Sequence, residues 1–127
     1  MNTNLMAVAL ASAFFAWTPS AHGQLTTERF IPVGRSPGIS GVRSYIGDVE
    51  RVEVEGRTCT VSGPQGSRTI KVTTRTRIWL DRSEQRLPNT VGTLWDLQPG
   101  RRVEVRYVDD EAKGAADWIK VVVTAGG

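Results

Sequence analysis

The chain has 127 residues and a formal net charge of +3, from 16 Lys and Arg against 13 Asp and Glu. One Cys and one His exclude an intrachain disulfide and a zinc site of several His and Cys ligands. The charge is ordinary for a small protein in solution, although a basic domain can also attract anionic partners.

The start of the chain is uncharged and hydrophobic. Residues 5–17 form an apolar run broken only by a serine, and Pro19 and the small-x-small triplet at 21–23 follow. This layout predicts a signal peptide over residues 1–23. The run is too short for a spanning helix, which needs roughly 20 apolar residues. We therefore expect an exported protein, periplasmic or secreted, without a membrane span.

Residues 24–41 contain two prolines and three glycines and lack sustained periodicity. The composition predicts a flexible N-terminal arm, which Phe30, Ile31 and Val33 could still pin in part to the domain. Whether the arm is ordered stays open. The remaining residues, 42–127, are expected to form one domain.

Alternation of apolar and polar residues dominates from Val42 onward and predicts β-strands. Gly47 lies inside the first of them, as at a bulge or a bend of a barrel. Residues 63–66, Gly-Pro-Gln-Gly, predict a hairpin turn. The expected strands are 43–53, 58–62, 68–74 with a continuation through Leu80, 101–108 and 115–124.

Between the third and fourth strands, residues 81–90 indicate a polar loop. Val91, Leu94 and Leu97 follow at a spacing of three and predict one helical turn. Five strands with a helical turn between the third and fourth are typical of the OB fold. The fold class predicted is therefore all-β, a small, five-stranded, partly open OB-like barrel.

Cys59 alternates with Val61 and is therefore expected on the inner face of its strand. A buried free cysteine behaves as a small hydrophobic residue. A reactive thiol or an intermolecular bridge is the alternative for an unpaired cysteine in an exported protein.

A set of turn glycines and strand residues resembles small exported bacterial OB-fold-like domains, many of unknown function. The resemblance covers 42–124 and implies a fold and a compartment, but no catalytic residue. The residues that carry it are Gly47-Asp48-Val49, Val52, Thr60-Val61, Thr76-Arg77-Ile78, Leu94, Leu97, Gly100, Val103, Val105, Ile119 and Val121.

The periplasmic copper/silver chaperone is similar in shape to such domains and binds its metal through His and Met beside a Trp. After residue 23 this chain has Trp79, Trp95 and Trp118 but neither His nor Met. Cys59 alone cannot replace a set of soft ligands. A copper chaperone is therefore not expected, and neither is any other metal or cofactor.

The residues that enzymes use are also scarce. A Ser or Cys nucleophile needs an adjacent base, and after residue 23 only three lysines could serve, none in a recognisable motif. Residues 109–111 are acidic but lack the spacing of a calcium loop. The acidic residues at 48–55 are expected to pair with arginines across strands. The sequence therefore predicts a protein that is not an enzyme.

Basic residues gather between Arg68 and Arg86, where only Asp81 and Glu84 oppose them. Basic residues beside aromatics hold nucleic acid strands on OB surfaces, although export makes nucleic acid an unlikely partner. An anionic glycan, a lipid headgroup or an acidic protein face fits better. The candidate ligand-binding residues are Lys71, Arg75, Arg77, Trp79 and Tyr107.

The alternative for this basic face is a solvated strand face whose arginines discourage edge-to-edge pairing. Trp95 and Trp118 are expected to help close the core. The function predicted is a non-enzymatic exported binding or adaptor module. The alternative is a structural or stress-protective envelope protein without a dedicated ligand, and the oligomeric state stays open.

Overall fold

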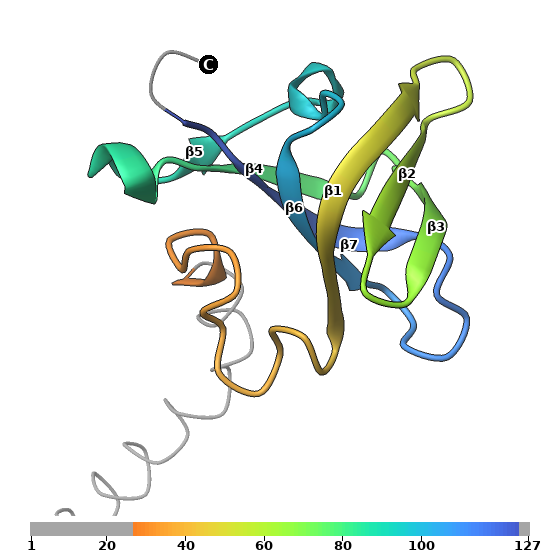
Figure 1. Ribbon diagram of the computed structural model, residues 1–127, viewed down its shortest axis with the longest axis horizontal. Coiled ribbons are helices and arrows are strands. Elements are labelled where there is room, and N and C mark those ends of the chain that lie inside the picture. Colours follow the sequence, from red (N-terminus) through yellow and green to blue (C-terminus); the bar gives the residue numbers. More distant parts are fainter. Residues whose placement is uncertain (1–26, 125–127) are drawn as a thin grey trace, which may run out of the picture.

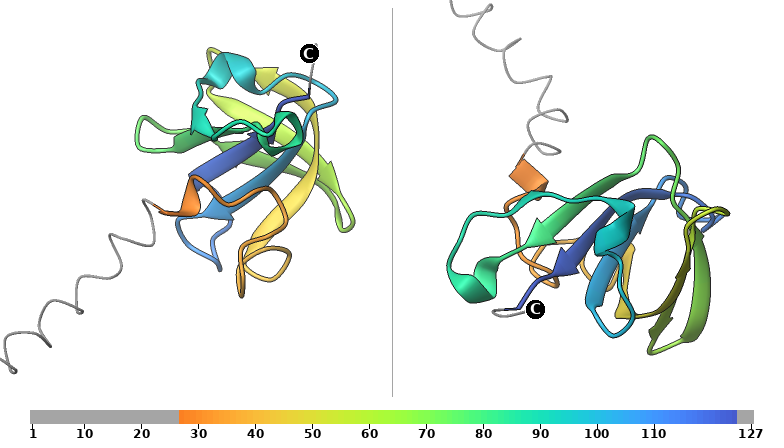
Figure 2. Two further views of the ribbon diagram at one scale, coloured as in Figure 1. Left: turned by 90° about the vertical axis from the view of Figure 1, so that its left-hand side faces the viewer. Right: turned by 90° about the horizontal axis from the view of Figure 1, so that it is seen from above.

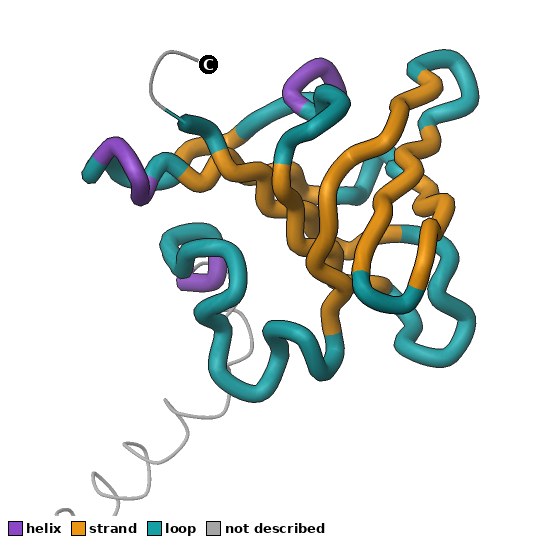
Figure 3. The backbone as a smooth tube through the Cα atoms, viewed as in Figure 1, coloured by secondary structure: helices purple, strands orange, loops and turns teal. Residues whose placement is uncertain are grey.

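The computed structural model describes residues 27–124, which form an all-β fold with two short 3-10 turns (Figure 1, Figure 3). One sheet contains seven strands in the order β3-β2-β1-β6-β7-β4-β5. The elements are β1 (Ser44–Glu53), β2 (Thr58–Gly63), β3 (Gly66–Lys71), β4 (Arg77–Asp81), η1 (Ser83–Gln85), β5 (Thr90–Val91), η2 (Leu94–Asp96), β6 (Arg102–Tyr107) and β7 (Ala116–Val122).

The sheet is mostly antiparallel and curls on itself. β4 and β7 pair in parallel, and the other neighbours pair antiparallel. An isolated parallel bridge joins Lys71, at the end of β3, to Ala115, just before β7. The Lys71 amide also donates to the Gly114 carbonyl at 3.0 Å. These contacts bring the two sides together without a full ladder, so the barrel is not closed.

The structure contains seven strands where the sequence predicted five, because the third predicted strand is divided and β5 is added. Thr73 and Thr76 cause the division. The Thr73 amide donates to Thr76 Oγ1 at 2.9 Å, and the Thr76 amide donates to the Thr73 carbonyl at 3.1 Å. A threonine hydroxyl that bonds nearby backbone competes with strand pairing. The chain therefore turns here, and β4 begins at Arg77.

The other predicted strands are confirmed to within a few residues, and so is the hairpin at 63–66, where Gly63 pairs with Gly66. Gly47 is not at the bulge, which falls between Val49 and Arg51 in the β1–β2 ladder. Gly47 instead marks a place where the backbones of β1 and β2 lie very close together, because a Cβ there would lie 2.2 Å from the Ser62 carbonyl oxygen.

The helical turn predicted over 91–97 is η2, and a capping box between Thr93 and Asp96 fixes its start. Leu97 is buried in the core and Leu94 packs against it. Val91 does not join them, since it belongs to β5 and is 66% exposed.

The core lies between the curled strands and follows the expected alternation. Cys59 and Val61 are both buried there, which confirms the inward face predicted for β2. Trp118 is buried but stacks on Trp79 outside the core cluster. The prediction for Trp95 is wrong, because its side chain is 70% exposed. Trp95 falls one position after Leu94, off the apolar stripe of the turn, and therefore points away from the core.

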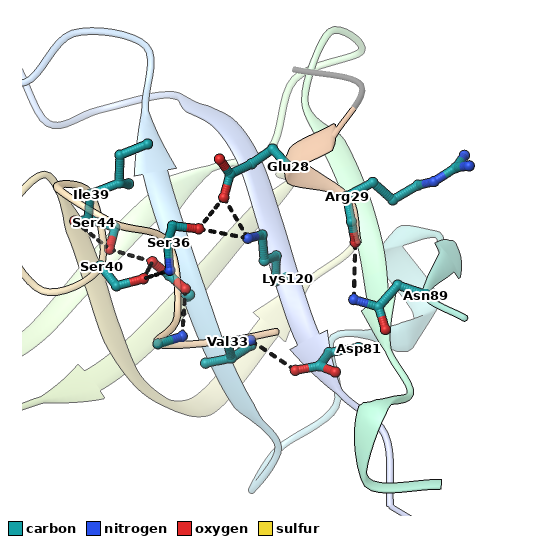
Figure 4. A network of polar contacts seen from close by, with 12 residues as sticks. Glu28, Arg29, Val33, Ser36, Ile39, Ser40, Ser44, Asp81, Asn89 and Lys120 are labelled. Atoms are coloured by element: carbon teal, nitrogen blue, oxygen red, sulfur yellow. Dashed lines mark hydrogen bonds and ion pairs between the residues drawn. The ribbon is translucent and has the colours of Figure 1, made fainter. Parts of the chain in front are cut away.

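The segment 27–43 lies against the outer face of β6, β7 and β4 (Figure 2). Lys120 and Glu104, paired across β7 and β6, are fully buried on this face. The Lys120 ammonium donates to Glu28 Oε1 at 2.6 Å and to Ser36 Oγ at 3.1 Å (Figure 4). These contacts join the segment to the middle of the sheet.

Further buried polar groups hold the same segment. The Glu104 carboxylate accepts hydrogen bonds from the Gly34 amide at 2.8 Å and from the Ser40 and Ser44 hydroxyls, each at 2.7 Å. Asp81 accepts one from the Val33 amide at 2.8 Å (Figure 4). No pattern in the sequence predicts these contacts of the segment that was expected to be a flexible arm. The boundaries of the signal peptide and the arm stay predictions, and residues 1–26 lie outside the described residues.

Candidate functional site

A groove of about 720 Å³ lies beside β4, between the β1–β2 turn, the 73–76 turn and η2. We call it the β4 groove. The residues that line it are Val54, Arg57, Thr73, Thr74, Thr76, Arg77, Ile78, Trp79, Val91, Gly92, Thr93, Leu94 and Trp95. A cavity of this size is typical of small-ligand sites.

Exposed apolar side chains contribute to the lining of the β4 groove. Trp95 is 70% exposed, Val91 66% and Val54 39%. Tryptophan is enriched where proteins make contacts, because its large ring can stack on a partner and its N–H can donate a hydrogen bond. Trp95 is therefore placed to contact a ligand without any rearrangement of the core.

Among the described residues, the charged side chains that line the β4 groove are both basic, Arg57 and Arg77, and the nearby Asp96 carboxylate accepts a hydrogen bond from the Thr93 amide at 2.7 Å. Arg57 Nε donates to the Val72 carbonyl at 2.7 Å, which fixes the guanidinium in place. Arg77 lies 3.7 Å from Asp117, but both side chains are well exposed, so the pair is weak. The electrostatics of the groove favour an anionic group.

Four threonines, Thr73, Thr74, Thr76 and Thr93, add hydroxyl groups to the lining. Thr76 Oγ1 already donates to the Ala116 carbonyl at 2.7 Å and holds the turn against β7. The groove thus combines an exposed tryptophan, two arginines and hydroxyls, a set able to bind a polar ligand that also has a face for stacking.

The five residues predicted as ligand-binding do not form one surface. Lys71, Arg75 and Arg77 are exposed, and of these Arg77 lines the β4 groove. Trp79 and Tyr107 are only 5% and 4% exposed, although Trp79 lines the β4 groove and Tyr107 lines a second cavity. Trp79 stacks on Trp118, with ring centroids 5.8 Å apart, and Tyr107 belongs to the core cluster.

Sequence reasoning missed Arg57 and Trp95. Arg57 comes from the β1–β2 turn and has a positive φ of 52°. No pattern in the sequence predicts this backbone conformation or the position of the side chain. Trp95 could have been found, because it breaks the spacing of Leu94 and Leu97. Trp79 is buried where it stacks on Trp118, which belongs to a strand that is distant in the sequence and adjacent in the fold. The sequence alone does not show this contact.

Cys59 is not part of a reactive site. It is 1% exposed, and burial raises the pKa of its thiol to about 11. The neutral thiol is a poor nucleophile and a poor metal ligand. Within residues 27–124, no group of three or more His, Cys, Asp or Glu side chains could hold a metal ion.

The acidic residues at 109–111 serve the β6–β7 turn. The Asp109 carboxylate accepts hydrogen bonds from the Glu111 amide at 2.9 Å and the Ala112 amide at 3.2 Å. These bonds lower the pKa of Asp109. Asp110 pairs with Arg106. Two of the three carboxylates are thus occupied within the turn and its neighbouring strand.

No protein-family model matches the chain, and no curated protein matches its sequence. Among solved structures, a copper(II)-bound variant of CusF from Escherichia coli is 15% identical, with a TM-score of 0.44, and the match covers 61% of this chain and 88% of that one. Silver(I)-bound CusF is 16% identical, with the same TM-score, and the match covers 61% of this chain and 93% of that one.

In the described part of the chain, no helix is both long and apolar enough to span a bilayer.

Proposed function

We propose that the chain is an exported, non-enzymatic binding module built on an OB-like barrel, and that the β4 groove holds an anionic ligand. The observation that carries the proposal is the groove lining, which combines an exposed tryptophan with two arginines and includes no carboxylate from the described residues. Export rests on the hydrophobic run at 5–17 and the small residues at 21–23.

The topology supports the barrel. Taking β3 and β4 as one interrupted strand, the fold has five main strands, with η2 between the third and the fourth. The last strand, β7, pairs in parallel with β4 and bridges the end of β3. Merged in this way, the seven-stranded sheet approaches the five-stranded, partly open arrangement predicted from the sequence, which supports the proposal of an OB-like barrel.

The ligand class that fits best is an acidic glycan. A sugar ring has an apolar face that can stack on Trp95, its hydroxyls can bond the threonines, and its carboxylate or sulfate can pair with Arg77. A lipid headgroup or an acidic protein face would also pair with the arginines, and the titration below distinguishes these ligand classes. A nucleic acid is not proposed, because an exported domain seldom meets one.

Calorimetric titration at low salt tests the proposal against an acidic oligosaccharide, its neutral counterpart, anionic vesicles and an acidic protein. We expect only the acidic oligosaccharide to bind. Replacing Arg77 by Glu should abolish binding, and replacing Trp95 by Ala should weaken it about 30-fold, the ~2 kcal/mol of a central aromatic contact. Arg51→Glu is the matched control, because Arg51 is exposed and lines no part of the groove.

Equal binding by Arg77→Glu and Arg51→Glu would remove the β4 groove as the site. Binding by vesicles or by the acidic protein alone would replace the glycan with that ligand class. No response to any probe, together with a molecular size that grows with concentration, would favour the structural role instead.

A further inference from the structure

A second cavity, of about 880 Å³, lies at the opposite end of β1 from the β4 groove. It is bounded by the start of β1, the turn between β2 and β3, and the turn between β6 and β7, all low in Figure 1. We call it the hairpin cavity. Its polar lining includes Arg43, Arg68, Arg102, Lys113 and the ring of Tyr107.

Positive charge exceeds negative charge in the hairpin cavity. Four basic side chains line it and only two acidic ones, Asp48 and Asp110. Asp48 lies 3.8 Å from Arg102, and Asp110 pairs with Arg106, so both carboxylates are already engaged. Within the described chain, Arg43 and Lys113 have no ion-pair partner. The cavity therefore has positive charge available for an anion.

The Arg68 guanidinium is held in position at the cavity. Its Cζ lies 3.9 Å from the centroid of the Tyr45 ring, and one terminal nitrogen donates to Gln65 Oε1 at 2.6 Å. Stacking and this hydrogen bond orient the planar group while leaving further N–H donors free. A pre-positioned arginine loses less freedom on binding an oxyanion than a mobile one does.

Tyr107 supplies the observation that points to a ligand. Its side chain is 4% exposed, and its buried hydroxyl has no hydrogen-bond partner among the described residues. Tyr45, which lines the same cavity, has a satisfied hydroxyl that donates to the Gly66 carbonyl and accepts from the Gln65 amide. A buried polar group without a partner is costly, and such cases in folded proteins are few.

We propose that the hairpin cavity binds a small molecule through a phosphate, sulfate or carboxylate group. The Tyr107 hydroxyl donates a hydrogen bond to the anion, and Arg68 pairs with it. The exposed side chains of Arg43 and Lys113 line the same cavity, are held by no ion pair in the described chain, and rearrange as the anion enters. This site lies apart from the β4 groove, and the proposal stands independently of the function proposed for that groove.

The test is calorimetric titration at low salt with inorganic phosphate, sulfate, glucuronate and, as the neutral control, glucose. The protein is expressed from the full sequence. We expect at least one anion to bind and glucose not to bind, and the anion preferred identifies the chemical group. Arg68→Gln should weaken binding about tenfold. Arg51→Gln, Arg77→Gln and Trp95→Ala should leave it unchanged, which separates this site from the groove.

Tyr107→Phe is the sharpest variant, since it removes only the hydroxyl. We expect about tenfold weaker anion binding together with an unchanged or raised melting temperature, because the lost hydroxyl has no partner in the free protein. A lowered melting temperature would show that the hydroxyl is satisfied structurally and would overturn the proposal. Absence of anion binding, or wild-type affinity in both Tyr107→Phe and Arg68→Gln, would overturn it as well.

Discussion

The Lys120 ammonium is fully buried between β7 and the segment 27–43, where it contacts Glu28, Ser36 and the Trp118 ring. Burial of a charge is costly unless the charge is paired and hydrogen-bonded. The contacts of Lys120 meet this condition through a carboxylate that is 92 residues away in the chain. A single side chain therefore couples the first described residues to one of the last strands.

Replacing Lys120 by Met should lower the free energy of unfolding by about 3 kcal/mol, because Glu28 would keep a buried charge without its partner. Urea denaturation followed by tryptophan fluorescence measures the change. Lys71→Met is the control, since Lys71 is exposed, and should alter stability by less than about 0.5 kcal/mol. Equal effects of the two substitutions would contradict the role given to Lys120.

Cys59 should react with a thiol reagent only after unfolding, because it is buried and its thiol stays neutral. Its pKa is raised from the usual 9.0 to about 11, so the unfolded chain loses this proton at lower pH than the folded chain does. The contribution of this group to stability is therefore complete below pH 9 and is lost as the pH rises toward 11. Rapid labelling of the native protein at pH 8 would contradict this account.

At the scale of elements, the β1–β2 pairing depends on Gly47. A Cβ at this position would lie 2.2 Å from the Ser62 carbonyl oxygen and 2.8 Å from its carbonyl carbon, both backbone atoms that cannot move alone. Strand β1 therefore approaches β2 more closely here than any larger residue would permit. The alternation of the sequence does not reveal this closeness.

Gly47→Ala should destabilise the protein by about 3 kcal/mol or more, since the strands must separate to accept the methyl group. Gly56→Ala is the matched control, because a Cβ at Gly56 meets nothing within 4 Å and should leave stability unchanged or slightly raised. Thermal unfolding by circular dichroism compares the two variants. A Gly47→Ala protein as stable as wild type would show that the close approach does not exist.

The elements also show which parts of the fold were predictable. Alternation located β1, β2, β6 and β7 because each has one face in the core. It failed at 72–76, where threonine side chains bond the backbone and end β3. It also gave no sign that the segment before β1 is held by Glu104 and Lys120, since polar contacts between distant residues have no periodicity.

Across the whole molecule, the candidate site was only partly predictable. The basic character of the 68–86 region and the place of Arg77 followed from the sequence. Trp79 and Tyr107 were assigned to the surface, yet the curled sheet buries both. Trp79 still lines the β4 groove, but the aromatic residue exposed there is Trp95, which η2 brings from outside that region. The separate turns that line the groove come together only because the sheet curls in three dimensions.

The β4 groove and the hairpin cavity lie at opposite ends of β1, so a ligand in one need not exclude a ligand in the other. The groove has an exposed aromatic face, whereas the cavity offers charge and a buried hydroxyl. The two sites are therefore expected to differ in the chemistry of their ligands, with a ligand that stacks on an aromatic ring in the groove and a small anion in the cavity.

The measurement that tests the central proposal most directly is tryptophan emission during titration with an acidic oligosaccharide at low salt. Trp95 is exposed in the β4 groove, whereas Trp79 and Trp118 are buried, so a ligand there changes mainly the Trp95 signal. We predict a saturable, salt-sensitive blue shift, lost in Trp95→Phe and weakened in Arg77→Gln. No shift in the wild-type protein, or an equal shift in Trp95→Phe, would contradict a ligand site in the groove.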